Sequence, residues 1–505
     1  MKLAKNELIA FFLVIFLFIL VESKGITHTA PGDENVYYYM AKSVAEGQLP
    51  YRDFFYAHPP LHILILALVV KIFGLSIPIL KSAELLVLVT GSFFLFKLSL
   101  EFFRNRLSDK SPVLISTLAL ILFLFSFEVM FKATFGMGTN MSLMFMLIAF
   151  YFLFTKKYFI GGIFSGLAGL TRFYTLAPLL AFFAFILFEI HKTEKSKAFL
   201  VQKIPNEFSW NQKFSGHRKS NGFSSEYREK RIKDFLNVIF GFLLTFGLVI
   251  TALTITFGQS FIEPVFKYHL LKPELPSQKI LVYKNIFFEN LPIILTFLLS
   301  IFIKDKKKFA VFYLAAAAYL LFLLFLNTIF EFYFIILFPF IALVGAYGIV
   351  NLMRRIKIGH YVKYGIVSLI IVIFLWSTAA DAVFLEKIGF SELKPLSQMT
   401  EKISETAQNE HLFGDDSIVP LLALLADRKI ALNFIDANEK RFTSGLTNFY
   451  IFTNQLDDVD ISYIIFRKNK GLHQIIEFRQ YAEQRCKLEE QYSDAAEGVF
   501  LFYKC

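Results

Sequence analysis

Charged side chains are scarce in this sequence. Asp, Glu, Lys and Arg make up 18% of the 505 residues, whereas apolar side chains make up 56%, and 64 residues are Phe. Such a chain has too little polar surface to cover a water-soluble globule, and it is too apolar to stay disordered. It also has only two cysteines, which excludes a small secreted module held together by several disulfides.

Motifs of soluble nucleotide and metal chemistry are missing as well. The sequence contains no P-loop, no HExxH pair, no zinc-ligand spacing and no glycine-rich dinucleotide fingerprint. We therefore expect neither ATP nor soluble nucleotide-sugar chemistry. The residues imply no definite cofactor. A divalent cation, Mg²⁺ or Mn²⁺, stays an open alternative, although one pair of acidic residues is too few to bind such an ion tightly.

The apolar residues are gathered in long runs. Most runs have the length of about 17–24 residues that crosses about 30 Å of hydrocarbon. They lie near residues 8–21, 60–75, 78–100, 112–131, 137–155, 158–172, 174–190, 235–257, 286–303, 309–326, 332–351 and 364–380. The sequence therefore predicts an α-helical polytopic membrane protein with about 11–13 transmembrane helices. The run 60–75 begins at Pro59-Pro60 and contains His62 and Lys71, so we expect it to be interfacial or re-entrant.

The positive net charge of +11 indicates orientation in the membrane. Residues 1–380 carry 38 basic and 21 acidic side chains, whereas residues 381–505 carry 14 and 20. Short basic loops usually lie in the cytoplasm. We therefore place the N-terminus there, with the loops 101–111, 191–234, 304–308 and 354–357. The segments that then face outside are 22–58, 132–140, 258–285, 327–331 and the tail after residue 380. This pattern favours a multi-pass protein of the cell membrane and not a nucleic-acid binder.

The C-terminal part of the chain differs from the rest. Its apolar patterns predict a small extracytoplasmic α/β domain, with helices at 418–427 and 473–490 and strands at 430–435, 461–467 and 498–504. We therefore divide the chain into a transmembrane domain, residues 1–380, and this second domain, residues 381–505. An extracytoplasmic location permits a disulfide between Cys486 and Cys505, but the sequence alone does not decide whether it forms.

The first outer loop is the most informative segment. It combines acids, aromatics, an Arg and a His in the groups PGDENVYYY at 31–39, GQLPYRD at 47–53 and HPPL at 58–61. A purely structural interpretation is available, in which Asp33 is the N-cap of a helix. The tyrosines would then belong to the aromatic belt that membrane proteins place at the interface.

A chemical interpretation competes with it. Asp33 and Glu34 are adjacent carboxylates at the outer end of the bundle, about one loop length from Arg52, Asp53 and His58. This combination suits attack by a hydroxyl on a phosphate-activated group, because the carboxylate takes the proton and the cations hold the departing phosphate.

The order of these residues resembles the first outer loop of GT-C glycosyltransferases, in particular the group of protein O-mannosyltransferases and lipid A aminoarabinose transferases. Two weaker similarities follow, the segment GLAGLTRF at 166–173 and the segment EFY at 331–333 with Phe338-Pro339. The latter stands where the family has an Arg-Tyr…Pro segment, but this chain has Glu331 and lacks the Arg. The resemblance covers most of residues 5–380.

The resemblance implies a GT-C-like bundle that transfers a sugar, with inversion, from a polyprenyl-phosphate donor on the outer face. The acceptor would be a hydroxyl of a glycan, a lipid or a protein. Asp33 would be the general base and Glu34 its catalytic partner, while His58 stands at a contact to the donor phosphate. The substrate contacts that we predict are Tyr37, Arg52, Asp53 and Tyr333.

A later outer loop offers further cations. Residues 258–285 include Lys267, His269 and Lys272, and a basic outer loop departs from the usual charge rule. A solvated surface is one explanation, and an anionic ligand is the other. We select Lys267 and His269 as contacts to the donor phosphate, with Arg172 as a deeper candidate.

Two other classes of function stay open. A transporter or flippase of lipid-linked glycans is expected to show internal repeats, and we recognise none. A structural membrane protein would leave the first outer loop without a chemical role. For the enzyme, the expected partners are a polyprenyl-phosphate sugar, an acceptor and membrane lipids.

Overall fold

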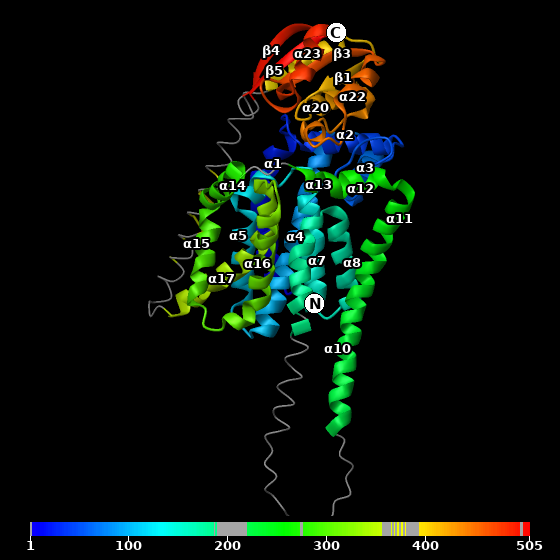
Figure 1. Cartoon of the computed structure of the whole chain (residues 1–505). Coiled ribbons are helices and arrows are strands. Elements are labelled where there is room, and N and C mark those ends of the chain that lie inside the picture. The colour runs from blue at the N-terminus through cyan, green and yellow to red at the C-terminus, as the bar shows by residue number, and fades with distance from the viewer. Residues whose placement is uncertain are drawn as a thin grey trace, which may run out of the picture.

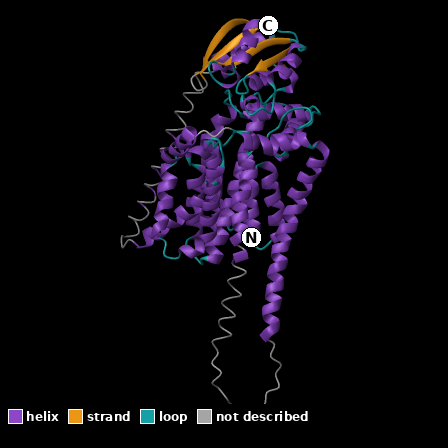
Figure 2. Ribbon diagram, viewed as in Figure 1, coloured by secondary structure: helices purple, strands orange, loops and turns teal. Residues whose placement is uncertain are grey.

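The protein is a bundle of helices with a small domain at one end (Figure 1). The strands lie in that domain, while the rest of the described chain is mainly helical (Figure 2). The computed structural model describes residues 3–185, 187–188, 220–272, 276–355, 365, 368, 371–372, 375–376, 379, 393–494 and 498–505. The domain boundary that we predicted at residue 380 lies outside these residues, as does most of the basic loop 191–234.

The bundle is built from helices of very different lengths. They include α1 Lys5–Thr27, α4 Ile77–Glu101, α5 Pro112–Leu124, α7 Thr139–Phe154, α8 Tyr158–Thr171, α10 Ser220–Phe242, α11 Leu248–Phe257, α14 Pro276–Glu289, α15 Leu291–Leu298, α16 Ala310–Phe325 and α17 Phe338–Arg355. The others are α2 Glu34–Ala45, α3 Leu61–Phe73, α6 Phe127–Phe131, α12 Gln259–Ile262 and α13 Tyr268–Leu271. Three π-helical segments continue neighbouring helices: η1 Phe102–Arg106, η3 Leu243–Gly247 and η4 Glu263–Lys267.

Several of these helices have the length and composition of membrane spans. Among the described residues, four qualify outright: Lys5–Thr27, Ile77–Asn105, Ile232–Phe257 and Lys306–Phe325. The pair Pro276–Glu289 and Leu291–Phe302 would form a fifth span, with a bend of 78°. Shorter apolar helices of 10–17 residues accompany them: Leu61–Phe73, Pro112–Leu124, Thr139–Phe154, Tyr158–Thr171 and Phe173–Phe185. The helical membrane architecture is confirmed, and the total number of spans stays a prediction.

Basic segments far apart in the sequence meet at one end of the bundle. Arg104 forms an ion pair with Glu7 near the start of α1, and Arg354 at the end of α17 pairs with Asp109 at 2.6 Å. The N-terminal part of α10 projects from this same end, opposite the C-terminal domain (Figure 1). The structure thus brings together loops that we expected to share one side of the membrane.

Close packing of α8 against α10 and η3 fixes the position of its C-terminal end. A Cβ atom on Gly162 would lie 2.2 Å from the Val238 carbonyl oxygen, and one on Gly166 would lie 1.9 Å from Thr245 Oγ1. Glycine at these two positions therefore permits the approach of α10 and η3, as small residues do between membrane helices. The helix ends where Arg172 adopts an extended conformation, with φ −151°.

The C-terminal domain contains a five-stranded mixed sheet with the order β2-β1-β3-β5-β4. Strand β1 is parallel to β2 and β3, while β5 is antiparallel to β3 and β4. A disulfide joins Cys486 to Cys505. The elements are α19 Leu393–Ser404, β1 His411–Gly414, α20 Val419–Leu425, β2 Lys429–Ile430, α21 Lys440–Thr443, α22 Phe449–Asp457, β3 Ile461–Arg467, α23 Ile476–Arg485, β4 Lys487–Asp494 and β5 Gly498–Lys504.

Two of our expectations for this domain were wrong. The strand expected at 430–435 ends at Ile430, because Leu432 and Asn433 have positive φ values of 55° and 51°. The helix expected at 473–490 ends at Arg485, and the following residues form β4 by pairing with β5. Long-range pairing here overrides the helix propensity of the local sequence.

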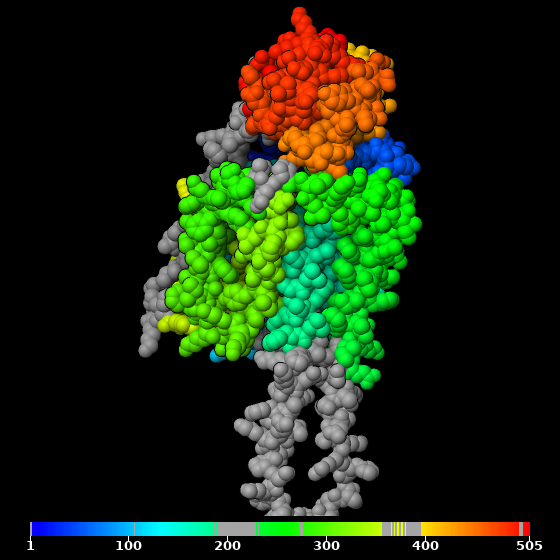
Figure 3. Space-filling model, in the orientation of Figure 1, coloured from blue at the N-terminus to red at the C-terminus, as the bar shows by residue number. Residues whose placement is uncertain are grey.

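The first outer loop is held between the bundle and the C-terminal domain (Figure 3). In α2, the Tyr39 hydroxyl donates to the Arg428 carbonyl oxygen at 3.3 Å and accepts from the Ile430 amide at 3.1 Å. Lys42 forms an ion pair with Asp427 at 2.6 Å. The domain therefore sits directly on the helix that follows Asp33.

Candidate active site

Asp33 stands immediately before α2 with its carboxylate available. It occupies the N-cap position, yet its side chain makes no capping hydrogen bond to the described first turn of the helix. The residue is exposed, and the amide of the preceding Gly32 donates to the Ser417 carbonyl oxygen at 2.8 Å. The capping interpretation of Asp33 therefore does not hold, and the carboxylate lies where the first outer loop meets the C-terminal domain.

Glu34 has a different environment. Its side chain is buried and folds back over Gly32, so that a Cβ atom there would lie 2.5 Å from Glu34 Oε2. Burial raises the pKa of Glu34, while the neighbouring Lys81 and Lys132 oppose this effect. This position fits a role in orienting the loop that carries Asp33.

Three basic side chains gather beside the first outer loop. The rings of His58 and His269 lie 5.3 Å apart, and His269 Nε2 donates to the Ala57 carbonyl oxygen at 2.7 Å. Burial, with help from the nearby Arg172 and His269, lowers the pKa of His58 well below its usual value. Lys272 interacts electrostatically with both histidines.

Burial and neighbouring charges control the protonation of these three side chains. Burial, followed by the charge of Lys272, lowers the pKa of His269 to about 3. Burial and the nearby Lys440 lower the pKa of Lys272 to about 8. At neutral pH both imidazoles are therefore neutral, while most Lys272 side chains are charged. A bound phosphate would favour the protonated form of all three side chains, His58, His269 and Lys272.

Arg172 completes the basic group from the end of α8. Its Nε donates to the Met137 carbonyl oxygen at 2.9 Å, and Nη2 donates to the same atom. Its Nη1 is buried without a hydrogen-bond partner among the described residues. The guanidinium carbon lies 5.1 Å from the centre of the Tyr37 ring. The Tyr37 side chain is a further hydrogen-bond partner of this guanidinium, so a ligand at Nη1 would share the cation with Tyr37.

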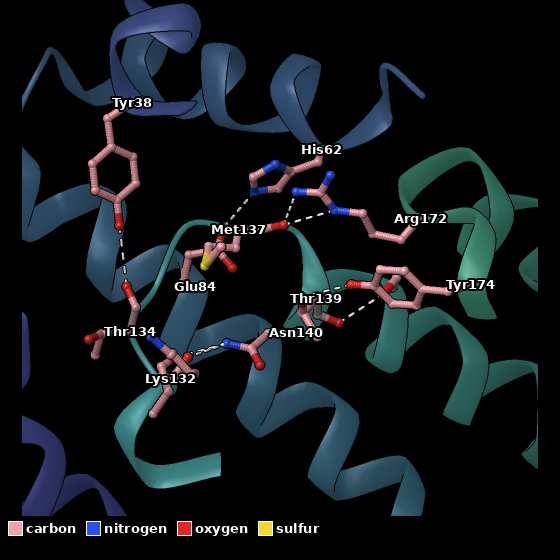
Figure 4. Close-up of polar contacts among 12 residues, drawn as sticks. Tyr38, His62, Glu84, Lys132, Thr134, Met137, Thr139, Asn140, Arg172 and Tyr174 are labelled. Atoms are coloured by element: carbon pink, nitrogen blue, oxygen red, sulfur yellow. Dashed lines mark hydrogen bonds and ion pairs between the residues drawn. The ribbon is translucent and has the colours of Figure 1, made fainter. Parts of the chain in front are cut away.

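The loop before α7 holds Arg172 in place (Figure 4). Gly138 has φ +74°, and a Cβ atom there would approach His62 to 2.9 Å and Arg172 Nε to 3.1 Å. Next to it, His62 Nε2 and Glu84 Oε1 lie 2.8 Å apart, and both side chains are fully buried. The loop is also bound by Tyr38, whose hydroxyl donates to the Thr134 carbonyl oxygen at 3.2 Å.

Aromatic side chains surround the same group. Tyr37 packs against His58, with ring centres 6.1 Å apart, and against His62, at 5.6 Å. Tyr333 packs on Tyr174 at 5.1 Å and interacts electrostatically with Arg172, Tyr37 and Asp33. The structure therefore brings the two predicted substrate contacts Tyr37 and Tyr333 to the predicted phosphate contacts.

Other predicted residues lie apart from this group. Lys267 is exposed and pairs with Glu263 at 3.3 Å. Arg52 pairs with Asp53 at 2.8 Å, and the Asp53 carboxylate accepts from the Leu49 amide. We find no contact of these three predicted residues, Lys267, Arg52 and Asp53, with the basic group in the described structure.

Lys272 was named from the sequence as part of the basic outer loop but was not selected as a phosphate contact. On one turn of helix, residues three apart share a face and residues two apart do not. The spacing from His269 therefore favours Lys272 over Lys267, and this signal was present in the sequence. No comparable signal existed for Asp436 and Arg441, which the fold brings here from the C-terminal domain.

The described residues offer no ready metal site. Nowhere in the described parts of the chain do three His, Cys, Asp or Glu side chains group closely enough to hold a metal ion. We therefore assign no residue to Mg²⁺ or Mn²⁺.

The fold is similar to that of a solved membrane protein. No protein-family model and no curated relative matches the chain. Two crystal structures of ArnT from Cupriavidus metallidurans match over nearly the full length. The apo structure has 11% sequence identity and a TM-score of 0.61, covering 97% of each chain. The structure bound to undecaprenyl phosphate has 10% identity and a TM-score of 0.60, covering 99% of this chain and 98% of that chain. The expected GT-C fold is confirmed.

Proposed function

We propose that this protein is a membrane glycosyltransferase that moves a sugar from a polyprenyl-phosphate donor to a hydroxyl acceptor. The observation that carries the proposal is the pairing of an uncapped, exposed Asp33 with a basic group that has an unused donor. Asp33 interacts electrostatically with Lys272, and the buried Arg172 Nη1 has no described partner. A base and an anion-binding group are the two parts that such a transfer needs.

The chemistry is a single displacement at the anomeric carbon. Asp33 takes the proton of the acceptor hydroxyl, whose oxygen forms a bond to the anomeric carbon. The bond from that carbon to the phosphate oxygen breaks, and its electron pair leaves with the lipid phosphate. Arg172, Lys272, His58 and His269 would hold that phosphate, and charged donors in a buried site stabilise the developing charge. Attack from the side opposite the leaving group inverts the anomeric configuration.

Two further observations support a lipid-linked donor. One of the two similar ArnT structures is bound to undecaprenyl phosphate, and a polyprenyl chain needs the apolar surroundings that these helices provide. The basic segments lie at the opposite end of the bundle (Figure 1), which supports an extracytoplasmic position of Asp33 under the charge rule.

The test is transfer by the purified full-length protein in lipid nanodiscs. Undecaprenyl-phosphate sugars carrying labelled mannose, glucose or arabinose are incubated with it and with acceptor glycans, lipids and peptides. We expect one label to move, giving a product of inverted anomeric configuration. Movement of the intact labelled donor across a vesicle membrane, without transfer of the sugar, would contradict the proposal and indicate a flippase.

A further inference from the structure

A segment of the C-terminal domain reaches the first outer loop beside the candidate active site. The guanidinium carbon of Arg441 lies 4.2 Å from the centre of the Phe55 ring and 4.2 Å from that of Phe434. Phe55 belongs to the first outer loop, whereas Phe434 belongs to the core of the C-terminal domain. A planar cation between two rings is a specific contact, so Arg441 fastens this segment to the loop.

The same arginine fixes the position of Asp436. Arg441 Nη1 donates to the Asp436 carbonyl oxygen at 3.0 Å, and Lys440 at the start of α21 donates its amide to the Asn438 side chain at 3.0 Å. These bonds make residues 436–441 a compact turn. Within this turn, the Asp436 carboxyl group also accepts a hydrogen bond from the Asn438 backbone amide. The turn therefore restricts the orientation of the Asp436 side chain.

The neighbours of that carboxylate are groups of the candidate active site. Asp436 interacts electrostatically with Arg441, with Lys272 and with Asp33. Burial raises its pKa, while Arg441 and Lys272 oppose that effect. Asp416 also interacts with Asp33 and Asp436, but the nearby Arg467 lies 3.8 Å from one of its oxygens. Asp436 is therefore the carboxylate of the C-terminal domain that interacts with both the base and the basic group and has no described ion pair with Arg467.

Its chemistry suits hydroxyl recognition. A second carboxylate does not bind an anionic donor phosphate, and the described acids do not form a metal site. A carboxyl group has two oxygens that form hydrogen bonds side by side, which matches two adjacent hydroxyl groups of one sugar ring. Its interaction with Asp33 and the contact of Arg441 with Phe55 link it to the loop that carries the proposed base.

We propose that Asp436 binds adjacent hydroxyl groups of the acceptor and that Arg441 is the positioning residue that holds it there. The C-terminal domain thus completes the active site, and the acceptor class is a glycan rather than a simple alcohol. This inference rests on the proposed function.

The experiment compares acceptors with the full-length protein in nanodiscs and the labelled undecaprenyl-phosphate sugar that the unaltered protein uses. The acceptors are octyl glycosides, the matching analogues that lack one of two adjacent hydroxyl groups, and octanol. We expect Asp436→Asn to raise the acceptor KM roughly 10–100-fold, with the donor KM unchanged, and to abolish the preference for adjacent hydroxyl groups. Arg441→Ala should do the same, and the double variant should be no worse than either single one.

Asp427→Asn is the matched control, because Asp427 lies at the same contact between domain and α2 but pairs with Lys42 at the surface. Its acceptor preference should stay normal. An unchanged acceptor preference in a folded Asp436→Asn variant would overturn this inference and leave the proposed function standing. Absence of sugar transfer by the unaltered protein would instead overturn the proposed function, and this inference with it.

Discussion

Arg172 donates two hydrogen bonds to the carbonyl oxygen of Met137. This contact fixes the guanidinium at the end of α8 and leaves Nη1 buried without a described partner. The backbone of the loop before α7 therefore decides where the cation points. This relationship makes the loop part of the candidate site, although none of its side chains was predicted to contact substrate.

Arg172→Lys should weaken use of the donor. Lysine keeps the charge but cannot bond Met137 with two nitrogens while offering a third. Loss of one charge-assisted contact to phosphate costs about 1.5–3 kcal/mol, which is a fall of roughly 10–100-fold in kcat/KM for the donor. Steady-state kinetics with varied donor measures this. Unchanged donor kinetics in a folded variant would remove Arg172 from the site.

Gly138→Ala should damage the site more than its backbone strain alone explains. The alanine would have to adopt a φ of +74°, which is strained for it, and its Cβ atom would also approach His62 and Arg172. Gly47→Ala is the control, because Gly47 has φ +100° but nothing within 4 Å of its Cβ position. Both variants should lose about 1–3 kcal/mol of stability, measured by thermal unfolding. Only Gly138→Ala should lose donor binding. Equal donor affinity in the two variants would contradict this role.

Donor binding should weaken at alkaline pH. The pKa of Lys272 is lowered to about 8, so its charge is lost as the pH rises from 7 to 9. The donor KM should therefore be nearly flat from pH 6 to 7 and rise roughly 10-fold between pH 7 and 9. Lys272→Arg should abolish the rise, because guanidinium stays charged throughout this range. The measurement is the donor KM against pH for the unaltered protein and for Lys272→Arg. An identical rise of KM in the two proteins would contradict the role of Lys272 and assign the rise to another group.

Much of the fold could be predicted from local patterns. Hydropathy located the described helices that have the composition of membrane spans, and alternation located β3 and β5 at their observed bounds. Strand β4 could not be found this way, because Lys487, Glu489 and Glu490 favour a helix and become a strand only by pairing with β5. The disulfide at Cys486 and Cys505 joins the same two strands. Such contacts depend on partners that a local pattern does not contain.

The candidate site was predictable where residue type and side of the membrane sufficed. His58, His269 and Arg172 were selected as contacts to the donor phosphate, and the structure places them together. Excluding Lys267 from the site requires knowing which face of a short helix it occupies. Its sequence spacing from His269 is only a weak indication of that face. Asp436 and Arg441 join the site through domain packing, which the sequence does not encode locally.

The role of Asp33 can be measured most directly with Asp33→Asn in nanodiscs. The account predicts that this variant binds the labelled undecaprenyl-phosphate sugar with unchanged affinity but transfers it roughly 10²–10⁴-fold more slowly. Asp427→Asn, a surface change on the same side of the protein, should transfer normally. Transfer by Asp33→Asn at the rate of the unaltered protein would contradict the assignment of the base and the account built on it.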